Sequence, residues 1–249
     1  MYGNYLLMKI LFVRHGEPDY EHDTLTEKGN REASLLADML CRMDIKAFYC
    51  SPLGRARRTA DFTLDKMGRE AEILPWLQEF RGRCVKPNIP GKESICWDWL
   101  PSDWTERKMF YDRDKWVLAP DFNGTNVSSE NNKVIRGLDE LLAGLGYERS
   151  GELYRAVRPN NDTVVFFCHF AVQCVMLGHL LGISPMVLFQ GLMAAPTGVT
   201  TVVTEERKEG IAAFRMLSFG SVQHLYVADE KPSFAGRFCE CYSNTDELH

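Results

Sequence analysis

Three features are absent from this 249-residue sequence, and each absence excludes a class of protein. No apolar run reaches the roughly 20 residues that a membrane-spanning helix needs, so we do not expect a membrane protein. None of the eight cysteines belongs to a CxxC pair, which argues against zinc-ribbon and redox motifs. An excess of positive charge is also missing, since the formal net charge is -5, and nucleic-acid binding is therefore not expected.

The composition that is present fits an enzyme-sized globular domain. Hydrophobic residues make up 45% of the chain and charged residues 25%, close to the averages of globular proteins. Because single α/β domains of this length are common, we predict one domain over residues 1–249. The cysteine pattern predicts reduced thiols, which indicate a cytoplasmic protein.

Short apolar strands alternate with amphipathic helices at the start of the chain. Strands are predicted at residues 8–13, 47–50 and 71–74, and helices at 27–43 and 54–67. This order is typical of an open parallel sheet. Later segments extend it: helices at 133–145 and 171–181, a buried strand at 163–168, and a hairpin of 199–204 with 211–217.

Basic residues and histidines follow three of the predicted strands. Arg14 and His15 follow the first, Ser51 and Arg55 the second, and His169 follows the strand at 163–168. Ligands bind at this edge of an open α/β sheet. Arginine binds phosphoryl oxygens bidentately, and a neutral imidazole can attack phosphorus. A lone histidine at a strand end is usually structural, but this combination predicts a phosphate site.

Four segments occur in a characteristic order: LFVRHGE (11–17), LTEKG (25–29), SPLGRARRTA (51–60) and TVVFFCHF (163–170). Together they resemble the histidine phosphatase superfamily, which has the phosphoglycerate mutase-like fold. The resemblance covers about residues 8–77 and 163–203. It implies a three-layer α/β/α fold with an open, mostly parallel sheet and an inserted loop and helix segment.

The resemblance also implies roles for the residues in these motifs. His15 corresponds to the nucleophile that becomes phosphohistidine. Arg14 and Arg55 correspond to the clamp on the phosphoryl oxygens, and His169 completes the pocket. The two arginines disfavour the imidazolium form of His15. Because they also supply positive charge, no metal or other cofactor is expected.

The acid–base residue of the family stands in a Leu-x-Glu step, which corresponds to Glu79 in this sequence. Glu17, Glu93 and Asp98 are the alternatives. Three departures from the family are visible: Phe170 follows the second histidine where glycine is usual, the mutase pattern is missing after Glu79, and the asparagine that many members place shortly after RHGE has no counterpart in residues 18–22. The second departure favours a phosphatase over a mutase.

The predicted function is hydrolysis of a small phosphorylated metabolite, for example a sugar, nucleoside or cobalamin-precursor phosphate. Three alternatives stay open: a phosphoglycerate mutase, a catalytically weak phospholigand-binding protein, and a metallohydrolase using His15, His169 and Glu79. A small phosphorylated substrate is the expected partner, and no nucleic acid or membrane is expected. The oligomeric state is left open.

Residues 81–130 interrupt the alternating pattern with prolines and tryptophans. The tryptophans are Trp97, Trp99, Trp104 and Trp116. We predict an insertion of loops and short helices within the same domain. Because it starts next to Glu79, we expect it to form part of the roof of the pocket and to act as a lid that sets substrate choice.

Overall fold

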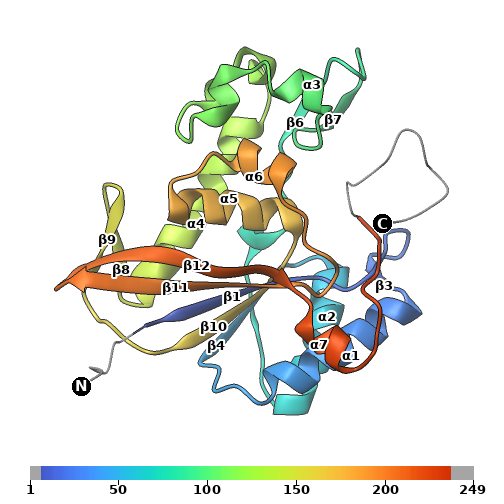
Figure 1. Ribbon diagram of the computed structural model, residues 1–249, viewed down its shortest axis with the longest axis vertical. Helices are drawn as coiled ribbons and strands as arrows, with labels where there is room; N and C mark the ends of the chain where they lie inside the picture. Colours follow the sequence, from blue (N-terminus) through green and yellow to red (C-terminus); the bar gives the residue numbers. More distant parts are fainter. Residues whose placement is uncertain (1–6, 237–249) are drawn as a thin grey trace.

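The computed structural model describes residues 7–236, which form a central eight-stranded sheet with helices on both faces (Figure 1). Across the sheet, the order is β5 (Glu72–Ile73), β4 (Ala47–Cys50), β10 (Thr163–Cys168), β1 (Lys9–Arg14), β11 (Val199–Lys208), β12 (Ile211–Ser221), β9 (Leu153–Ala156) and β8 (Tyr147–Ser150). Only β11 and β9 run against β1, so six of the eight strands point the same way. The expected three-layer fold with an open, mostly parallel sheet is confirmed.

Helices cover the two faces of the sheet in separate groups (Figure 1). One group is α1 (Glu27–Leu40), α2 (Gly54–Met67) and α7 (Gln223–Val227), and the other is α4 (Val127–Gly144), α5 (Phe170–Leu181) and α6 (Pro185–Gly191). The four predicted helices are all present. The helix predicted from residue 133 begins earlier, at Val127, because polar residues hide the apolar pattern of its first turn.

The side chains of β1 explain why helices cover both faces of the sheet. Ile10 and Phe12 belong to the apolar cluster that includes α4 and α5, whereas Leu11 and Val13 pack with α1 and α2. Successive side chains of a strand point to opposite faces of the sheet. A strand that is apolar at every position is therefore buried on both sides, as parallel strands usually are.

The hairpin of β8 and β9 at one edge of the sheet is not anticipated from the sequence. Each strand has four residues, and charged side chains such as Glu148, Arg149 and Arg155 break the apolar alternation. Charged side chains are common on edge strands, where they discourage pairing with other chains. The short helices α6 and α7 are also not predicted.

The insertion contains short elements, as expected, and also a small hairpin that is not expected. The hairpin pairs β6 (Arg83–Val85) with β7 (Glu93–Ile95), and the helical turns are α3 (Pro101–Trp104), η2 (Lys108–Tyr111), η3 (Trp116–Leu118) and η4 (Pro120–Phe122). Trp99, Phe110, Trp116 and Phe122 pack ring against ring. These rings belong to the same apolar cluster as α4 and α5.

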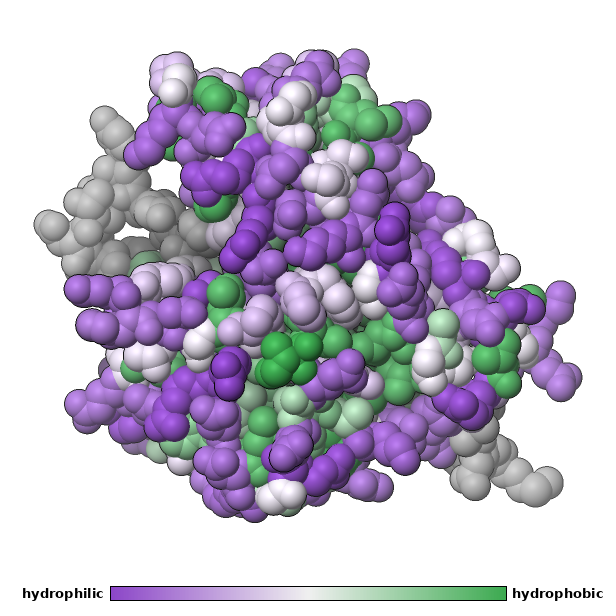
Figure 2. Space-filling view, turned by 180° about the vertical axis from the view of Figure 1, so that it is seen from behind, coloured by the Kyte–Doolittle hydropathy of each residue, from purple (hydrophilic) through white to green (hydrophobic). Residues whose placement is uncertain are grey.

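The surface is mainly polar on the face opposite to that of Figure 1. Figure 2 shows hydrophilic residues over most of this face and smaller hydrophobic areas near its middle. Within residues 7–236, no helix combines the length and apolar character needed to cross a bilayer.

Candidate active site

Three adjacent parallel strands bring the predicted site residues to one edge of the sheet. β10 lies between β1 and β4. The backbone N–H of His15 donates to the carbonyl of Cys168 at 3.0 Å, and that of Ser51 donates to the carbonyl of Phe167 at 2.9 Å. The ends of the three strands are therefore in register, and His15, Ser51 and His169 follow them at the same edge of the sheet.

A helix cap and a close backbone approach explain two positions of the LTEKG segment. The hydroxyl of Thr26 accepts a hydrogen bond from the N–H of Gly29 at 3.0 Å and so caps the start of α1. A Cβ atom on Gly29 would lie 2.3 Å from the carbonyl oxygen of Glu17. Only glycine allows α1 to approach the loop after His15 this closely.

His15 is held as a neutral imidazole with its Nε2 lone pair available. Its side chain is buried, and Nδ1 lies 2.8 Å from the carbonyl oxygen of Gly16. A carbonyl can only accept, so Nδ1 carries the ring proton. Burial, followed by the charges of Arg14 and Arg55, holds the pKa of His15 well below its usual range. A neutral ring with an unprotonated Nε2 is the form that can attack phosphorus.

His169 lies beside His15, with ring centroids 5.1 Å apart. Its Nε2 is 2.8 Å from the hydroxyl of Ser51, which also accepts from the N–H of Leu53. Among the described residues, the buried Nδ1 has no hydrogen-bond partner. Burial is the main reason that the pKa of His169 is well below its usual range, and His15 and the nearby arginines lower it further.

Arg14 is almost fully buried, and two distant segments hold its guanidinium. Nη1 donates to the carbonyl of Ala194, shortly before β11, and Nη2 donates to the carbonyl of Gly236 at 3.2 Å. The charge of Arg14 contributes to lowering the pKa values of both His15 and His169. Its contact with Gly236 is not foreseen from the sequence.

Arg55 reaches the same edge from the first turn of α2. Its Nη1 forms a 2.7 Å ion pair with Asp23, and its guanidinium carbon is 5.5 Å from the centre of the Tyr20 ring. Among the described residues, the buried Nε of Arg55 has no hydrogen-bond partner. Asp23 also accepts from the N–H of Gly54 at 2.7 Å and thereby positions the start of α2. Sequence reasoning misses Asp23, because no motif marks it and its partner lies 32 residues away.

Glu79 lies at the N-terminus of α5, the helix that begins directly after His169. Its Oε1 accepts from the N–H groups of Ala171 and Val172, each at 3.1 Å, and from that of Phe80 at 2.9 Å. Burial raises the pKa of this carboxyl, although these hydrogen bonds and the charges of Arg14 and Arg55 act in the opposite direction. A carboxyl with a raised pKa beside two cationic side chains is suited to proton transfer.

The three alternative acid–base residues occupy other environments. Glu17 accepts hydrogen bonds from the hydroxyls of Thr26 and Ser233, which gives it a structural role. Glu93 lies exposed on β7 in the insertion. Asp98 is also in the insertion, where its carbonyl accepts from the ammonium group of Lys86 at 2.6 Å.

Phe170, which replaces the usual glycine after the second histidine, links the site to the insertion. It is the first residue of α5 and is buried. Its ring packs edge-on against Trp97, with centroids 6.1 Å apart. Trp97 is therefore an insertion tryptophan that packs on the residue following His169, whereas Trp99 and Trp116 contact Phe110 and Phe122 of the insertion, respectively.

Comparisons with known sequences agree with this geometry. The profile of the histidine phosphatase superfamily (branch 1) matches residues 10–109. A Schizosaccharomyces pombe protein described as a probable phosphatase is 23% identical over 238 residues, which cover 88% of this chain and 95% of that protein. A 2,3-bisphosphoglycerate-dependent phosphoglycerate mutase from Thermoplasma acidophilum is 39% identical over 74 residues, covering 25% of this chain and 37% of the mutase.

Solved structures share the fold over most of this chain. Phosphoserine phosphatase from Entamoeba histolytica has a TM-score of 0.56 and 21% identity, covering 88% of this chain and 99% of its own. The α-ribazole phosphatase of Shigella flexneri has a TM-score of 0.54 and 18% identity, covering 86% and 97%. The family profile over residues 10–109, the sequence relatives and the shared fold therefore agree in their similarity to the histidine phosphatase superfamily.

Proposed function

We propose that this protein is a phosphatase that hydrolyses a small phosphorylated metabolite through a phosphohistidine on His15. The observation that carries the proposal is the state of His15, which is neutral, carries its proton on Nδ1 and lies beside Arg14 and Arg55. The phosphoserine and α-ribazole phosphatases that share the fold are named for small phosphorylated molecules, which supports this substrate class.

In the first step, the Nε2 lone pair of His15 forms a bond to phosphorus as the bond to the leaving oxygen breaks. The protonated carboxyl of Glu79 gives its proton to that oxygen, and the product leaves as an alcohol. In the second step, water attacks phosphorus and gives a proton to the Glu79 carboxylate. The bond between phosphorus and Nε2 then breaks and returns its electron pair to His15.

Positive charge and directed donors stabilise the phosphoryl group in both steps. The guanidinium groups of Arg14 and Arg55 match the geometry of phosphoryl oxygens and stay charged at all relevant pH values. When the Ser51 hydroxyl donates to Nε2 of His169, the ring proton of His169 is on Nδ1. This N–H can then donate to a third oxygen of the phosphoryl group. Substrate positioning and charge stabilisation are the main requirements of phosphoryl transfer.

A phosphoglycerate mutase reaction is the second candidate, because the match to the Thermoplasma acidophilum mutase has the higher identity over a short span. A mutase forms the same phosphohistidine but returns the phosphoryl group to a bound acceptor instead of water. Release of inorganic phosphate, measured beside isomer interconversion of phosphoglycerates, separates the two reactions.

We propose that the reaction needs no metal ion, because the two arginines supply the charge. Activity is then expected to persist in a chelator and to be unchanged by added magnesium or zinc. Within the described part of the chain, no group of three or more His, Cys, Asp or Glu side chains is arranged to hold a metal ion.

A cytoplasmic location is part of the same proposal. The cysteines of the described region carry free thiols, which supports a reducing compartment: Cys41, Cys50, Cys84, Cys96, Cys168 and Cys174. Cys239 and Cys241 lie outside the described residues.

A panel of phosphorylated metabolites assayed for phosphate release tests the proposal, with His15→Ala as the blank. We expect release from at least one member of the panel by the wild-type protein and none above the blank by the variant. Absence of release from every member, combined with tight binding of phosphorylated compounds, would favour a binding protein instead.

A further inference from the structure

The C-terminal segment reaches the phosphate clamp, and two acidic residues hold it there. Resting on the proposed function, we infer that Glu17 and Glu32 are positioning residues of the active site. They anchor Ser233, and through it they place the carbonyl of Gly236 against the guanidinium of Arg14. None of the superfamily motifs in the sequence includes Glu32, Ser233 or Gly236.

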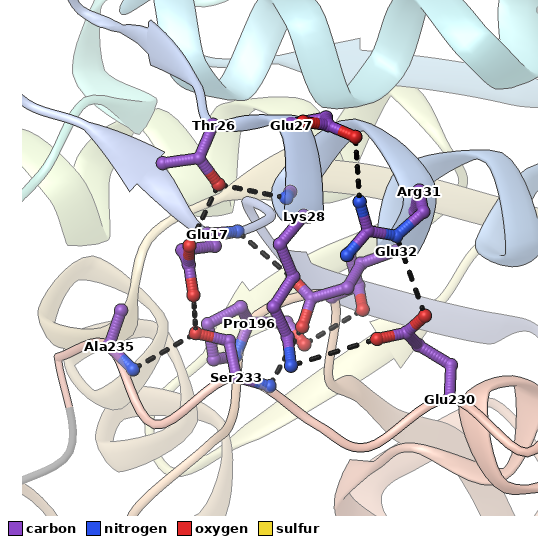
Figure 3. Close-up of polar contacts among 12 residues, drawn as sticks. Glu17, Thr26, Glu27, Lys28, Arg31, Glu32, Pro196, Glu230, Ser233 and Ala235 are labelled. Atoms are coloured by element: carbon purple, nitrogen blue, oxygen red, sulfur yellow. Dashed lines mark hydrogen bonds and ion pairs between the residues drawn. The ribbon is translucent and has the colours of Figure 1, made fainter.

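Ser233 is itself buried and is held from two sides by carboxyl groups (Figure 3). Its N–H donates to Oε1 of Glu32 at 2.8 Å, and its hydroxyl donates to Oε2 of Glu17. The second oxygen of Glu32 accepts the N–H of Glu17 at 3.0 Å, and the second oxygen of Glu17 accepts the hydroxyl of Thr26 at 2.8 Å. The loop after His15 and the C-terminal segment are therefore joined through the same two side chains.

Further contacts keep the segment aligned on both sides of Ser233. The N–H of Ala235 donates to the Ser233 hydroxyl at 3.0 Å. On the other side, the carboxylate of Glu230 lies 3.6 Å from Lys28 and 3.6 Å from Arg31, both on α1 (Figure 3). Surface ion pairs of this kind contribute little stability, so the buried contacts of Ser233 are the principal anchor.

The anchored segment ends in a close contact with Arg14. Gly236 accepts from Nη2 of Arg14 at 3.2 Å and has a φ of +65°. A Cβ atom at this position would lie 2.3 Å from Nη2 and 3.8 Å from the hydroxyl of Tyr20, whose ring contacts Arg55. Any other residue at 236 would push the guanidinium away, so glycine is required for this arrangement.

This geometry gives the acidic pair a function in phosphate binding. The carbonyls of Ala194 and Gly236 accept from Nη1 and Nη2 of Arg14, and they fix the plane of the guanidinium. A guanidinium whose plane is fixed in advance loses less conformational entropy when it binds phosphoryl oxygens. Release of Ser233 removes one of these two carbonyls and weakens binding without altering His15.

The proposal is tested by measuring the affinity of the full-length protein for inorganic phosphate by calorimetry. Ser233→Ala, Glu32→Gln and Gly236→Ala are compared with wild type and with Gly151→Ala. Gly151 is the matched control, since it also has a positive φ of 58° but no atom within 4 Å of the position that a Cβ would occupy. Hydrogen exchange of the amides at 233–236 reports independently on whether the segment is released.

We expect phosphate affinity to fall on the order of tenfold in the three variants and to be unchanged in Gly151→Ala, in line with the loss of a charge-assisted hydrogen bond. In Ser233→Ala and Glu32→Gln, the amide hydrogens of residues 233–236 should also exchange faster than in wild type. Faster exchange with unchanged phosphate affinity and unchanged kcat/KM would overturn the inference. A wild-type protein that binds phosphate but hydrolyses no metabolite would contradict the proposed function alone, because the affinities of the variants would still decide the inference.

Discussion

The imidazole rings of His15 and His169 lie 5.1 Å apart at the ends of adjacent parallel strands, and burial keeps both rings uncharged. Two protonated rings at this distance would repel each other and the neighbouring arginines. The site therefore presents positive charge through Arg14 and Arg55, while His15 keeps a lone pair for bond formation.

Replacing His15 by alanine should abolish nearly all turnover, because no other group in the site offers a comparable lone pair. Rapid acid or base quench of wild type during turnover should reveal an acid-labile, base-stable phosphoenzyme that maps to His15. Circular dichroism establishes that the variant is folded. A variant that retains turnover, or a phosphate mapped elsewhere, would contradict the nucleophile assignment.

Replacing Arg55 by alanine should lower kcat/KM by at least roughly 10²-fold, the usual effect of removing a donor that stabilises transition-state charge. Arg57→Ala is the matched control, because Arg57 is two positions along the same helix and is exposed. The control should behave as wild type. If the two variants lose equal activity, Arg55 has no special role in the clamp.

Replacing Glu79 by glutamine should slow hydrolysis of an alkyl phosphate by roughly 10²–10⁴-fold, the usual contribution of general acid–base catalysis. Formation of the phosphoenzyme from nitrophenyl phosphate should be slowed much less, since nitrophenolate needs no proton to leave. Equal losses with both substrates would indicate a structural role for Glu79.

The raised pKa of Glu79 predicts that formation of the phosphoenzyme depends on pH. Burial raises the pKa of Glu79, so the carboxyl keeps its proton to a higher pH than an exposed glutamate. With an alkyl phosphate, the rate of phosphoenzyme formation should fall as pH rises through this raised pKa. Glu79→Gln should lack this decline, and its persistence in the variant would assign the titration to another group.

Replacing Trp97 by leucine should change the ranking of substrates, because this ring packs on Phe170 next to His169. Trp99→Leu is the control: its ring packs on Phe110 and Phe122 within the insertion, so we expect lower thermal stability with the same ranking. Specificity constants across the metabolite panel measure the difference. An unchanged ranking in Trp97→Leu would remove the support for a roof over the substrate.

The buried Glu32 predicts a dependence of stability on pH. Burial and the neighbouring Glu17 raise the pKa of Glu32 from 4.5 to about 7, so the folded protein binds this proton more tightly than the unfolded chain. The resulting stabilisation is complete below about pH 4.5 and is lost as pH rises through about 7. At about 1.4 kcal/mol per pH unit, the change is roughly 3 kcal/mol.

Denaturant unfolding of wild type and Glu32→Gln between pH 4 and 8 measures this effect. Wild type should lose stability relative to the variant as pH rises, while all other titrations cancel in the comparison. A difference in unfolding free energy that stays constant with pH would show that Glu32 keeps an ordinary pKa.

The sequence alone was sufficient to predict the parallel half of the sheet and the site residues that follow its strands. Strands β4 and β10 and helix α2 have the predicted boundaries, because apolar periodicity and flanking residues such as Pro52 and Gly68 are local signals. The meeting of His15 with His169 also followed from the sequence, since the carboxyl ends of parallel strands in one sheet share an edge.

Tertiary structure alone decided what holds these residues in place. The contacts of Asp23 with Arg55, of Glu32 with Ser233 and of Gly236 with Arg14 join positions 32, 201 and 222 residues apart. No local pattern encodes such pairs, because hydrogen bonds between distant segments depend on how the whole chain packs. The burial that raises or lowers the pKa values of the site residues has the same origin, since the sequence specifies side chains but the fold decides which of them lose contact with water.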